Sequence, residues 1–331
     1  MSDAADSFLR LLRDDGLVHS PGAKLTPLPG GVSSEIYRVD GDGDTFVVKR
    51  ALAKLKVQDD WAADVSRNTY ERRYLEYAGR VLPGSVPMLR KTDPASRYFA
   101  MEYFGPEFRN WKETLLAGSF DPTQAGAAGR ILGRIHRLSF GDPQAATLFN
   151  SLPCFKQLRL EPYLLTTGRR HPELEEIFVA EVQRLAGTSE CLVHGDFSPK
   201  NLLFGGDRMV LLDCEAAWYG DPAFDVCFLL NHLFLKSLFH SNAKGLAPLV
   251  RTFWEEYMAA AFHTIEERVP RLLLMLLLAR IDGKSPVEYL KEPQKDFVRR
   301  FVHAQLPRPP VSLFALSDAW FREMMEPGGK R

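Results

Sequence analysis

The segment LVHGDFSPKNLLFGGDRMVLLDCE, residues 192–215, constrains the fold of this chain more than any other feature. Its two apolar runs, NLLF and MVLLD, are separated by Gly-Gly-Asp-Arg at positions 205–208. A glycine-containing break between two apolar runs predicts a β-hairpin. In the expected register Phe204 faces Met209, so the residues that flank the hairpin meet at its open end.

This open end collects oxygen-bearing side chains. The register places Asn201 opposite Leu212, one residue before Asp213. An amide oxygen and a carboxylate on adjacent strands suit Mg²⁺ bound together with substrate phosphates. Asp196 lies in the loop that leads into this end, where a carboxylate can orient an acceptor hydroxyl and take its proton. The segment therefore predicts phosphoryl transfer, with Asp196 as the catalytic residue and Asn201 and Asp213 as metal ligands.

The order of these motifs resembles that of a known family. His194-Gly195-Asp196 precedes Asn201 with the Asp-to-Asn spacing of the protein-kinase loop H-R-D-x-x-x-x-N, and Asp213-Cys214-Glu215 stands where those kinases have D-F-G. The HGD form, the D-x-E and the following YGDPAFD resemble the aminoglycoside phosphotransferase and choline kinase-like family more closely than the protein kinases. The stretch after Asp213 is also distantly similar to methylthioribose kinases. The catalytic loop of methylthioribose kinases differs from the one in this sequence, so their substrate is not expected for this chain.

This resemblance spans residues 25–236 and implies an α+β fold of two lobes, like that of protein kinases. Residues 1–103 would form a nucleotide-binding lobe with a small antiparallel sheet. Residues 104–331 would form a mainly helical lobe that carries catalysis and binds the acceptor. ATP and Mg²⁺ would be the cofactors, and the acceptor would be a hydroxyl of a sugar, an amino alcohol or an aminoglycoside-like molecule.

The family pattern also implies a nucleotide site in the first lobe. LPGGVSSEIYRV would cover the phosphates with Gly31, Ser33 and Ser34, whose amides and hydroxyls are hydrogen-bond donors. Lys49, at the end of FVVK, would contact the α and β phosphates. Glu71 is preferred to Glu76 as the partner of that lysine.

Further residues receive supporting roles. The backbone of Glu102 and Tyr103, in the connector between the lobes, would bind an adenine edge. Glu215 is either a second metal ligand or a hydrogen-bonding partner, and the sequence favours neither. Asp225 is expected to brace the catalytic loop, and His194 to organise it. Lys200 and Arg280 are candidates for contact with an anionic group on substrate or nucleotide, and the sequence shows no metal-ligand spacing among the histidines, including His171 and His303.

Local patterns predict the elements around these motifs. We expect a first helix at about 4–14, strands within 25–49, a helix at about 61–78 and a strand pair ending in YFAMEYF. From Thr123 onward the pattern is helical, and further helices are expected at about 173–187, 223–239, 246–266, 270–281, 294–305 and 315–325.

Three other functions compete with that of a small-molecule kinase. A protein kinase needs a long activation segment after the aspartate at position 213. Here Asp225 follows Asp213 after only the short run CEAAWYGDPAF, which leaves no room for such a segment. A metal-dependent hydrolase built on His194 and Asp196 lacks further ligands at fixed spacing. A nucleotide-binding scaffold without catalysis remains the alternative. Loss of catalysis in such a scaffold usually removes the lysine, the catalytic aspartate or the metal aspartate, and candidates for all three are present here.

Composition excludes several classes of partner. The 42 basic and 42 acidic residues balance, which argues against a broad nucleic-acid surface. The longest apolar run, LLLMLLLA at 272–279, is shorter than the roughly 20 residues that a membrane span needs. The four cysteines lack zinc-type spacing, and the first residues lack the apolar stretch of a signal peptide. The chain is therefore expected to be cytoplasmic, with no nucleic-acid or membrane partner.

Overall fold

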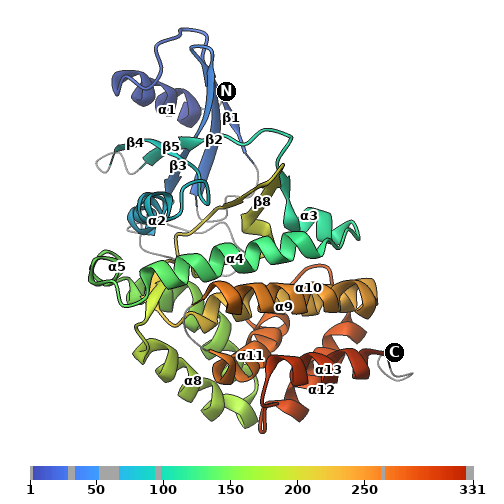
Figure 1. Ribbon diagram of the computed structural model, residues 1–331. Coiled ribbons are helices and arrows are strands. Elements are labelled where there is room, and N and C mark those ends of the chain that lie inside the picture. Colours follow the sequence, from blue (N-terminus) through green and yellow to red (C-terminus); the bar gives the residue numbers. More distant parts are fainter. Residues whose placement is uncertain (1–2, 29–33, 52–66, 94–97, 262–264, 326–331) are drawn as a thin grey trace.

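The computed structural model describes residues 3–28, 34–51, 67–93, 98–261 and 265–325. Figure 1 shows an antiparallel sheet and two helices at one end of the molecule and a larger, mainly helical part at the other. The two parts meet where the sheet ends, above the long helices of the second part. The α+β, two-part architecture expected from the sequence is present.

The first part is a five-stranded antiparallel sheet with the order β1-β2-β3-β5-β4. Its strands are β1 (Lys24–Pro27), β2 (Ser34–Gly41), β3 (Asp44–Ala51), β4 (Leu89–Asp93) and β5 (Tyr98–Glu102). The helices are α1 (Asp3–Asp14) and α2 (Arg67–Val81). Helix α1 buries Phe8 and Leu12 against β-strand side chains such as Val39. The predicted strands and first helix are confirmed, whereas positions 61–66 of the predicted helix lie outside the described residues.

The second part is mainly helical. Its helices are α3 (Trp111–Leu116), α4 (Pro122–Ser139), α5 (Pro143–Leu148), α6 (Leu152–Phe155), the π-helix η1 (Lys156–Leu165), α7 (Thr166–Arg170), η2 (Pro172–Leu174), α8 (Glu175–Gly187), η3 (Pro199–Asn201), α9 (Ala223–His240), α10 (Ala243–Ala260), η4 (Glu266–Arg268), α11 (Val269–Asp282), α12 (Glu292–Gln305) and α13 (Leu313–Met325). Every helix predicted after Thr123 is present, although α10 ends at Ala260 rather than near 266. The helices between 143 and 170 were not predicted.

The apolar run at 272–279 forms the buried centre of α11. It packs against α9, which is itself buried along most of its length. No helix within the described residues combines the length and the hydropathy that a membrane crossing requires. The run is therefore core of the helical part, as its length suggested.

Short strands carry the motif-bearing loops. They are β6 (Arg109–Asn110), β7 (Cys191–Val193), β8 (Leu202–Gly205), β9 (Arg208–Leu211) and β10 (Trp218–Gly220). Strands β8 and β9 form the predicted hairpin, with Phe204 opposite Met209. Leu212 N–H donates to the Asn201 carbonyl at 2.9 Å, which extends this pairing by one step toward Asp213. The register derived from the turn residues is confirmed.

Candidate active site

The loop that carries Asp196 is anchored by a buried carboxylate. Asp225, in the first turn of α9, accepts hydrogen bonds from His194 N–H at 2.6 Å and from Gly195 N–H at 2.9 Å. His136 of α4 lies 3.3 Å from the same carboxylate and 3.0 Å from the hydroxyl of Tyr257 on α10. The loop is thereby fixed to three core helices, which is the bracing role that the sequence assigned to Asp225.

Gly195 allows this loop its shape. Its φ of +76° lies in the left-handed region, and a Cβ at this position would stand 2.3 Å from the carbonyl oxygen of Ala216. Both features require glycine, because other residues seldom adopt this φ and no side-chain rotation relieves a clash with backbone. The shape of the loop therefore depends on the absence of a side chain here.

We expect Gly195→Ala to lower the free energy of unfolding by more than about 3 kcal/mol, since strain and a backbone clash act together. Urea unfolding measures this change. Gly206→Ala is the matched control, because Gly206 has φ +55° but nothing within 4 Å of an added Cβ. That variant should lose only about 1 kcal/mol. Equal losses in the two variants would mean that the contact with Ala216 does not matter.

His194 is held as a neutral, structural side chain. Its Nδ1 faces the Asp196 N–H at 3.2 Å, and its Nε2 lies 3.1 Å from the Leu212 carbonyl. The first contact needs an acceptor and the second a donor, so the proton is on Nε2. Burial lowers the pKa of His194 below its ordinary value, although Asp225 opposes this shift. The ring therefore ties the catalytic loop to the end of β9.

Asp196 is buried, with 4% of its surface exposed, between two cationic side chains. Arg159 Nη2 lies 3.1 Å and Lys200 Nζ 2.9 Å from the same oxygen, Oδ2. Arg159 also donates from Nε to the Gly195 carbonyl. Within the described residues nothing hydrogen-bonds to the other oxygen, Oδ1. That atom is free to accept a hydrogen bond from an acceptor hydroxyl.

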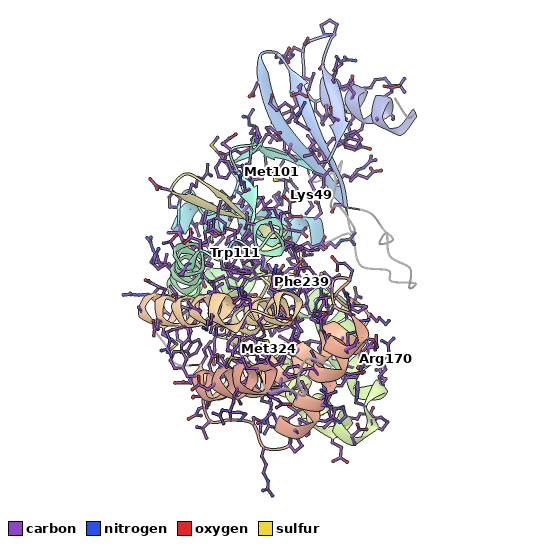
Figure 2. All side chains as sticks on the ribbon, turned by 90° about the vertical axis from the view of Figure 1, so that its right-hand side faces the viewer. Lys49, Met101, Trp111, Arg170, Phe239 and Met324 are labelled. Carbon is purple, nitrogen blue, oxygen red and sulfur yellow. The ribbon has the colours of Figure 1, made fainter. Side chains whose placement is uncertain are left out.

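Lys49 on β3 lies between two carboxylates at the junction of the two parts (Figure 2). Its Nζ is 2.7 Å from Glu71 Oε1 and 2.6 Å from Asp213 Oδ1. The structure thus forms the pair with Glu71 that the sequence favoured, while Glu76 lies 3.8 Å from Arg72 on its own helix. This arrangement holds the ammonium in a fixed position between the two carboxylates.

The pKa values around Lys49 reflect burial and mutual attraction. Burial alone would lower the pKa of Lys49, but Asp213 and Glu71 outweigh it and the pKa lies above its ordinary value. Burial raises the pKa of Glu71 to about 7, against the attraction of Lys49. Burial would also raise the pKa of Asp213, yet Lys49 and Lys200 hold it well below its usual range. Asp213 is therefore the more acidic of the two carboxyl groups that contact Lys49.

The predicted metal ligands meet at the end of the β8–β9 hairpin. Asn201 donates from Nδ2 to the Asp196 carbonyl at 2.9 Å, which leaves its amide oxygen as the potential ligand atom. Carboxylate oxygens of Glu71, Asp213 and Glu215 lie within 4.8 Å of one another. Asp213 has φ +60°, an unusual backbone angle that turns the chain at the end of the hairpin.

The position of Glu215 is compatible with both roles that the sequence left open. It belongs to this carboxylate group, and its Oε2 also lies 3.1 Å from Nε of Arg67, a fully buried side chain at the start of α2. Arg67 therefore compensates part of its charge. Ordered carboxylate and amide oxygens of this kind are the donors that Mg²⁺ prefers, so the donor set fits that ion.

The remaining nucleotide-site predictions have different outcomes. Gly31 and Ser33 lie outside the described residues. Ser34 begins β2 and is buried. Glu102 ends β5, but its N–H donates to the Met88 carbonyl at 2.9 Å and its side chain pairs with Arg208 at 2.7 Å. The Glu102 N–H is therefore not available for an adenine contact, and only the carbonyl of Glu102 could make one. The Tyr103 ring lies 5.6 Å from the guanidinium of Arg38.

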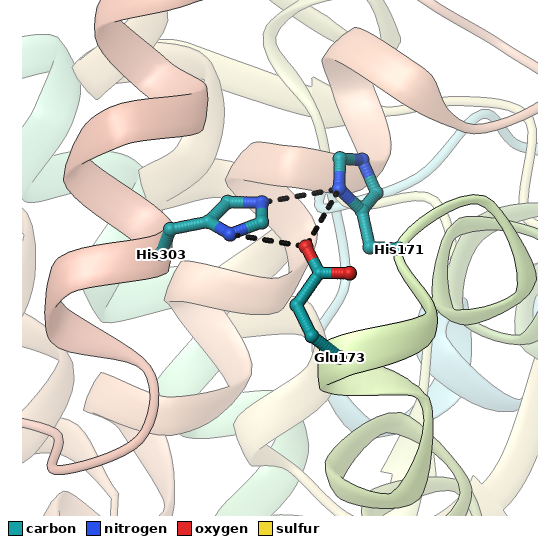
Figure 3. Close-up of side chains that lie close together, drawn as sticks. All are labelled: His171, Glu173 and His303. Atoms are coloured by element: carbon teal, nitrogen blue, oxygen red, sulfur yellow. Dashed lines mark hydrogen bonds and ion pairs between the residues drawn. The ribbon is translucent and has the colours of Figure 1, made fainter.

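Sequence reasoning missed Arg159, which contacts Asp196 from the unpredicted helix η1. It also missed a second group of possible metal ligands, shown in Figure 3. His303 Nε2 lies 3.1 Å from His171 Nδ1, and His303 Nδ1 lies 3.2 Å from Glu173 Oε1. The spacing of the histidines along the sequence gives no sign of this group, because its residues meet only in the fold. They join η2 to α12, at the end of the helical part far from the sheet (Figure 1).

Known proteins are similar to this chain in sequence or in fold. A methylthioribose kinase from Escherichia coli O45:K1 (strain S88 / ExPEC) is 25% identical over 282 residues, covering 71% of this chain and 66% of that protein. The structure of a choline/ethanolamine kinase family protein from Mesorhizobium loti aligns over 99% of both chains, with TM-score 0.52 and 15% identity. An amicoumacin kinase in complex with AMP-PNP and Ca²⁺ aligns over 96% of this chain and 100% of its own, with TM-score 0.56 and 15% identity.

The structural similarities confirm the protein-kinase-like fold, and the sequence relative confirms the more distant resemblance to methylthioribose kinases. The chain spans just under two thirds of the length of that relative. A family model described as the phosphotransferase enzyme family matches residues 24–273, most of the chain and all the motifs above. The protein belongs to this phosphotransferase enzyme family.

Proposed function

We propose that this chain is an ATP- and Mg²⁺-dependent kinase that transfers the γ-phosphoryl group of ATP to a hydroxyl of a small molecule. Family membership supports the class of reaction. The observation that carries the proposal is the state of Asp196: Oδ2 is held by two cations, while Oδ1 is free within the described residues. A carboxylate held in this way can fix the direction of an incoming hydroxyl.

In the proposed reaction, the acceptor oxygen attacks the γ-phosphorus as Asp196 Oδ1 takes the hydroxyl proton. The new bond joins the acceptor oxygen to phosphorus, and the bond between the γ-phosphorus and the bridging oxygen of ADP breaks. Lys49 steadies the α and β phosphates. Mg²⁺, held by Asn201, Asp213 and Glu215, would neutralise charge on the phosphates.

The two parts of the chain divide this work in the proposal. Residues 1–103, with Ser34, Lys49, Glu71 and the loop at Gly31 and Ser33, bind the nucleotide. The connector at Glu102 and Tyr103 meets the adenine. Residues 104–331 hold the catalytic loop and the acceptor. The reaction would take place in the cytoplasm, where ATP is available, and would need neither nucleic acid nor membrane.

The proposal is tested by a screen for Mg²⁺-dependent ADP release with sugars, amino alcohols, aminoglycosides and hydroxy acids. We expect at least one acceptor to raise ADP release well above the acceptor-free ATPase rate in wild type, and not in Asp196→Asn. ATP binding with no acceptor-dependent turnover across the screen would favour the scaffold alternative. Absence of ATP binding would contradict the proposal outright.

A further inference from the structure

Lys236, on α9, is a buried lysine without an acidic partner. Only 1% of its surface is exposed, yet no hydrogen bond or ion pair reaches its ammonium from the described residues. The ring centroid of Tyr289 lies 5.1 Å from Nζ of Lys236. A buried cation without an anion is costly, so a position of this kind calls for a ligand or another functional reason.

Other basic side chains surround Lys236 from neighbouring elements. Burial lowers the pKa of Lys236 to about 7, with help from Lys112 on α3 and Arg280 on α11 and against the attraction of Glu288. Glu288 itself lies 2.6 Å from Lys112 Nζ, so that carboxylate is already paired. Burial and the charge of Lys236 likewise lower the pKa of His232 well below its ordinary value. The region therefore has more basic than acidic groups.

A chain of contacts joins this region to the catalytic residue. The guanidinium of Arg159, which pairs with Asp196, lies 5.7 Å from the ring centroid of Tyr163. The guanidinium of Arg280 lies 5.7 Å from the same ring, and its Nη1 is 3.3 Å from the tyrosine hydroxyl. One aromatic ring thus lies between the arginine at Asp196 and the arginine near Lys236.

Helix α9 provides a second connection. The guanidinium of Arg159 lies 5.6 Å from the ring of Phe228, and Phe228 contacts the ring of His232 at 5.8 Å. Lys236 follows one helical turn later, so these α9 residues share one face. The basic side chains along this path are Arg159, Lys200, Arg280, Lys236 and Lys112, and the carboxylates that accompany them are Asp196 and Glu288.

We infer that the acceptor is a small hydroxylated anion, whose hydroxyl meets Asp196 Oδ1 and whose carboxylate or phosphate is bound by Arg280 and Lys236. This inference rests on the proposed function and specifies the substrate class. An anion would balance the excess of positive charge and form charge-assisted hydrogen bonds with both side chains. A cationic acceptor would meet three basic groups beyond Asp196, which are Arg280, Lys236 and Lys112, and only one carboxylate, Glu288, which already pairs with Lys112.

Matched acceptor pairs test this inference. Glycerate is compared with glycerol, gluconate with glucitol, and ribose 5-phosphate with ribose, while choline represents cations. We expect turnover with an anionic member and little or none with its neutral partner or with choline. The carboxylate and phosphate pairs show which anionic group the site accepts.

Two variants link the preference to the named residues. Lys236→Met and Arg280→Met should each raise KM for the anionic acceptor by about 10-fold or more, the loss expected for one hydrogen bond to a charged group. KM for ATP should stay unchanged. Lys244→Met removes an exposed lysine of α10 as the control and should change neither value. Preferential turnover of a neutral or cationic acceptor would overturn the inference while leaving the kinase proposal intact.

Stability gives a readout that does not depend on turnover. Folding lowers the pKa of Lys236 from 10.5 to about 7, so the unfolded chain binds more protons between those pH values. The contribution of Lys236 to stability therefore rises with pH across this window. Lys236→Met should melt at a higher temperature than wild type near pH 6, and its advantage should shrink toward pH 9.

The same melting experiment reports binding. Gluconate and ribose 5-phosphate are each added as probes. At least one of them should raise the melting temperature of wild type more than that of Lys236→Met, because bound anion stabilises the folded protein. An equal rise in both proteins, or in neither, would overturn the inference. If the rise depends on Lys236 but no acceptor is phosphorylated, the anion subsite stands and the kinase proposal fails.

Discussion

Replacing Asp196 by asparagine is expected to lower kcat by about 100- to 10,000-fold, the usual contribution of a positioned general base. The amide keeps the size of the side chain but cannot take the hydroxyl proton. ATP binding should change little, because Asp196 contacts Arg159 and Lys200 rather than the Lys49 cluster. The measurements are kcat with the acceptor found by the screen and Kd for ATP by calorimetry.

Loss of the Asp196 charge also leaves two cations near each other, so folding must be checked in the same preparation. Retained ATP affinity and an unchanged circular dichroism spectrum would show that Asp196→Asn is folded. Asp207→Asn, in the exposed turn of the β8–β9 hairpin, is the control for removal of a nearby acid. A variant with wild-type kcat would remove Asp196 from the mechanism.

The predictable part of this protein is the part built from short-range signals. The β8–β9 hairpin follows from two apolar runs and a glycine turn, and its register alone places Asn201 next to the strand end that carries Asp213. The resemblance to the family's E-x-x-x-L pattern, which Glu71 and Leu75 match, favours Glu71 over Glu76 as the partner of Lys49, and the structure forms that pair. In each case the interaction depends on residues whose relative position one or two elements determine.

The unpredicted part depends on long-range packing. Arg159 reaches Asp196 from a π-helix, and the sequence offered no regular period by which to expect that helix. Lys236 stands in an apolar run of α9, where a lysine ordinarily marks an exposed position. Its burial results from the packing of α11 and the following segment, which no local pattern encodes. Basic groups from several helices thus come together in one region of the interior that only the fold reveals.

Replacing Asp213 by asparagine is expected to weaken ATP binding in the presence of Mg²⁺ by about 10- to 100-fold, a usual range for damage to a metal site. Asparagine tolerates the left-handed φ of +60° at this position, so the backbone should not change. The change removes only the charge. Asp213 Oδ1 contacts Lys49, so in the proposed site Oδ2 is the oxygen that would bind Mg²⁺.

The test is calorimetric titration of ATP with Mg²⁺ and again with EDTA. We expect the loss in affinity only with Mg²⁺, because without the ion the carboxylate repels the phosphates and its removal favours binding. Glu76→Gln, which removes a half-exposed acid from α2, should behave as wild type in both titrations. An equal loss in both titrations would mean that Asp213 acts by holding Lys49 in place and that the metal is bound elsewhere.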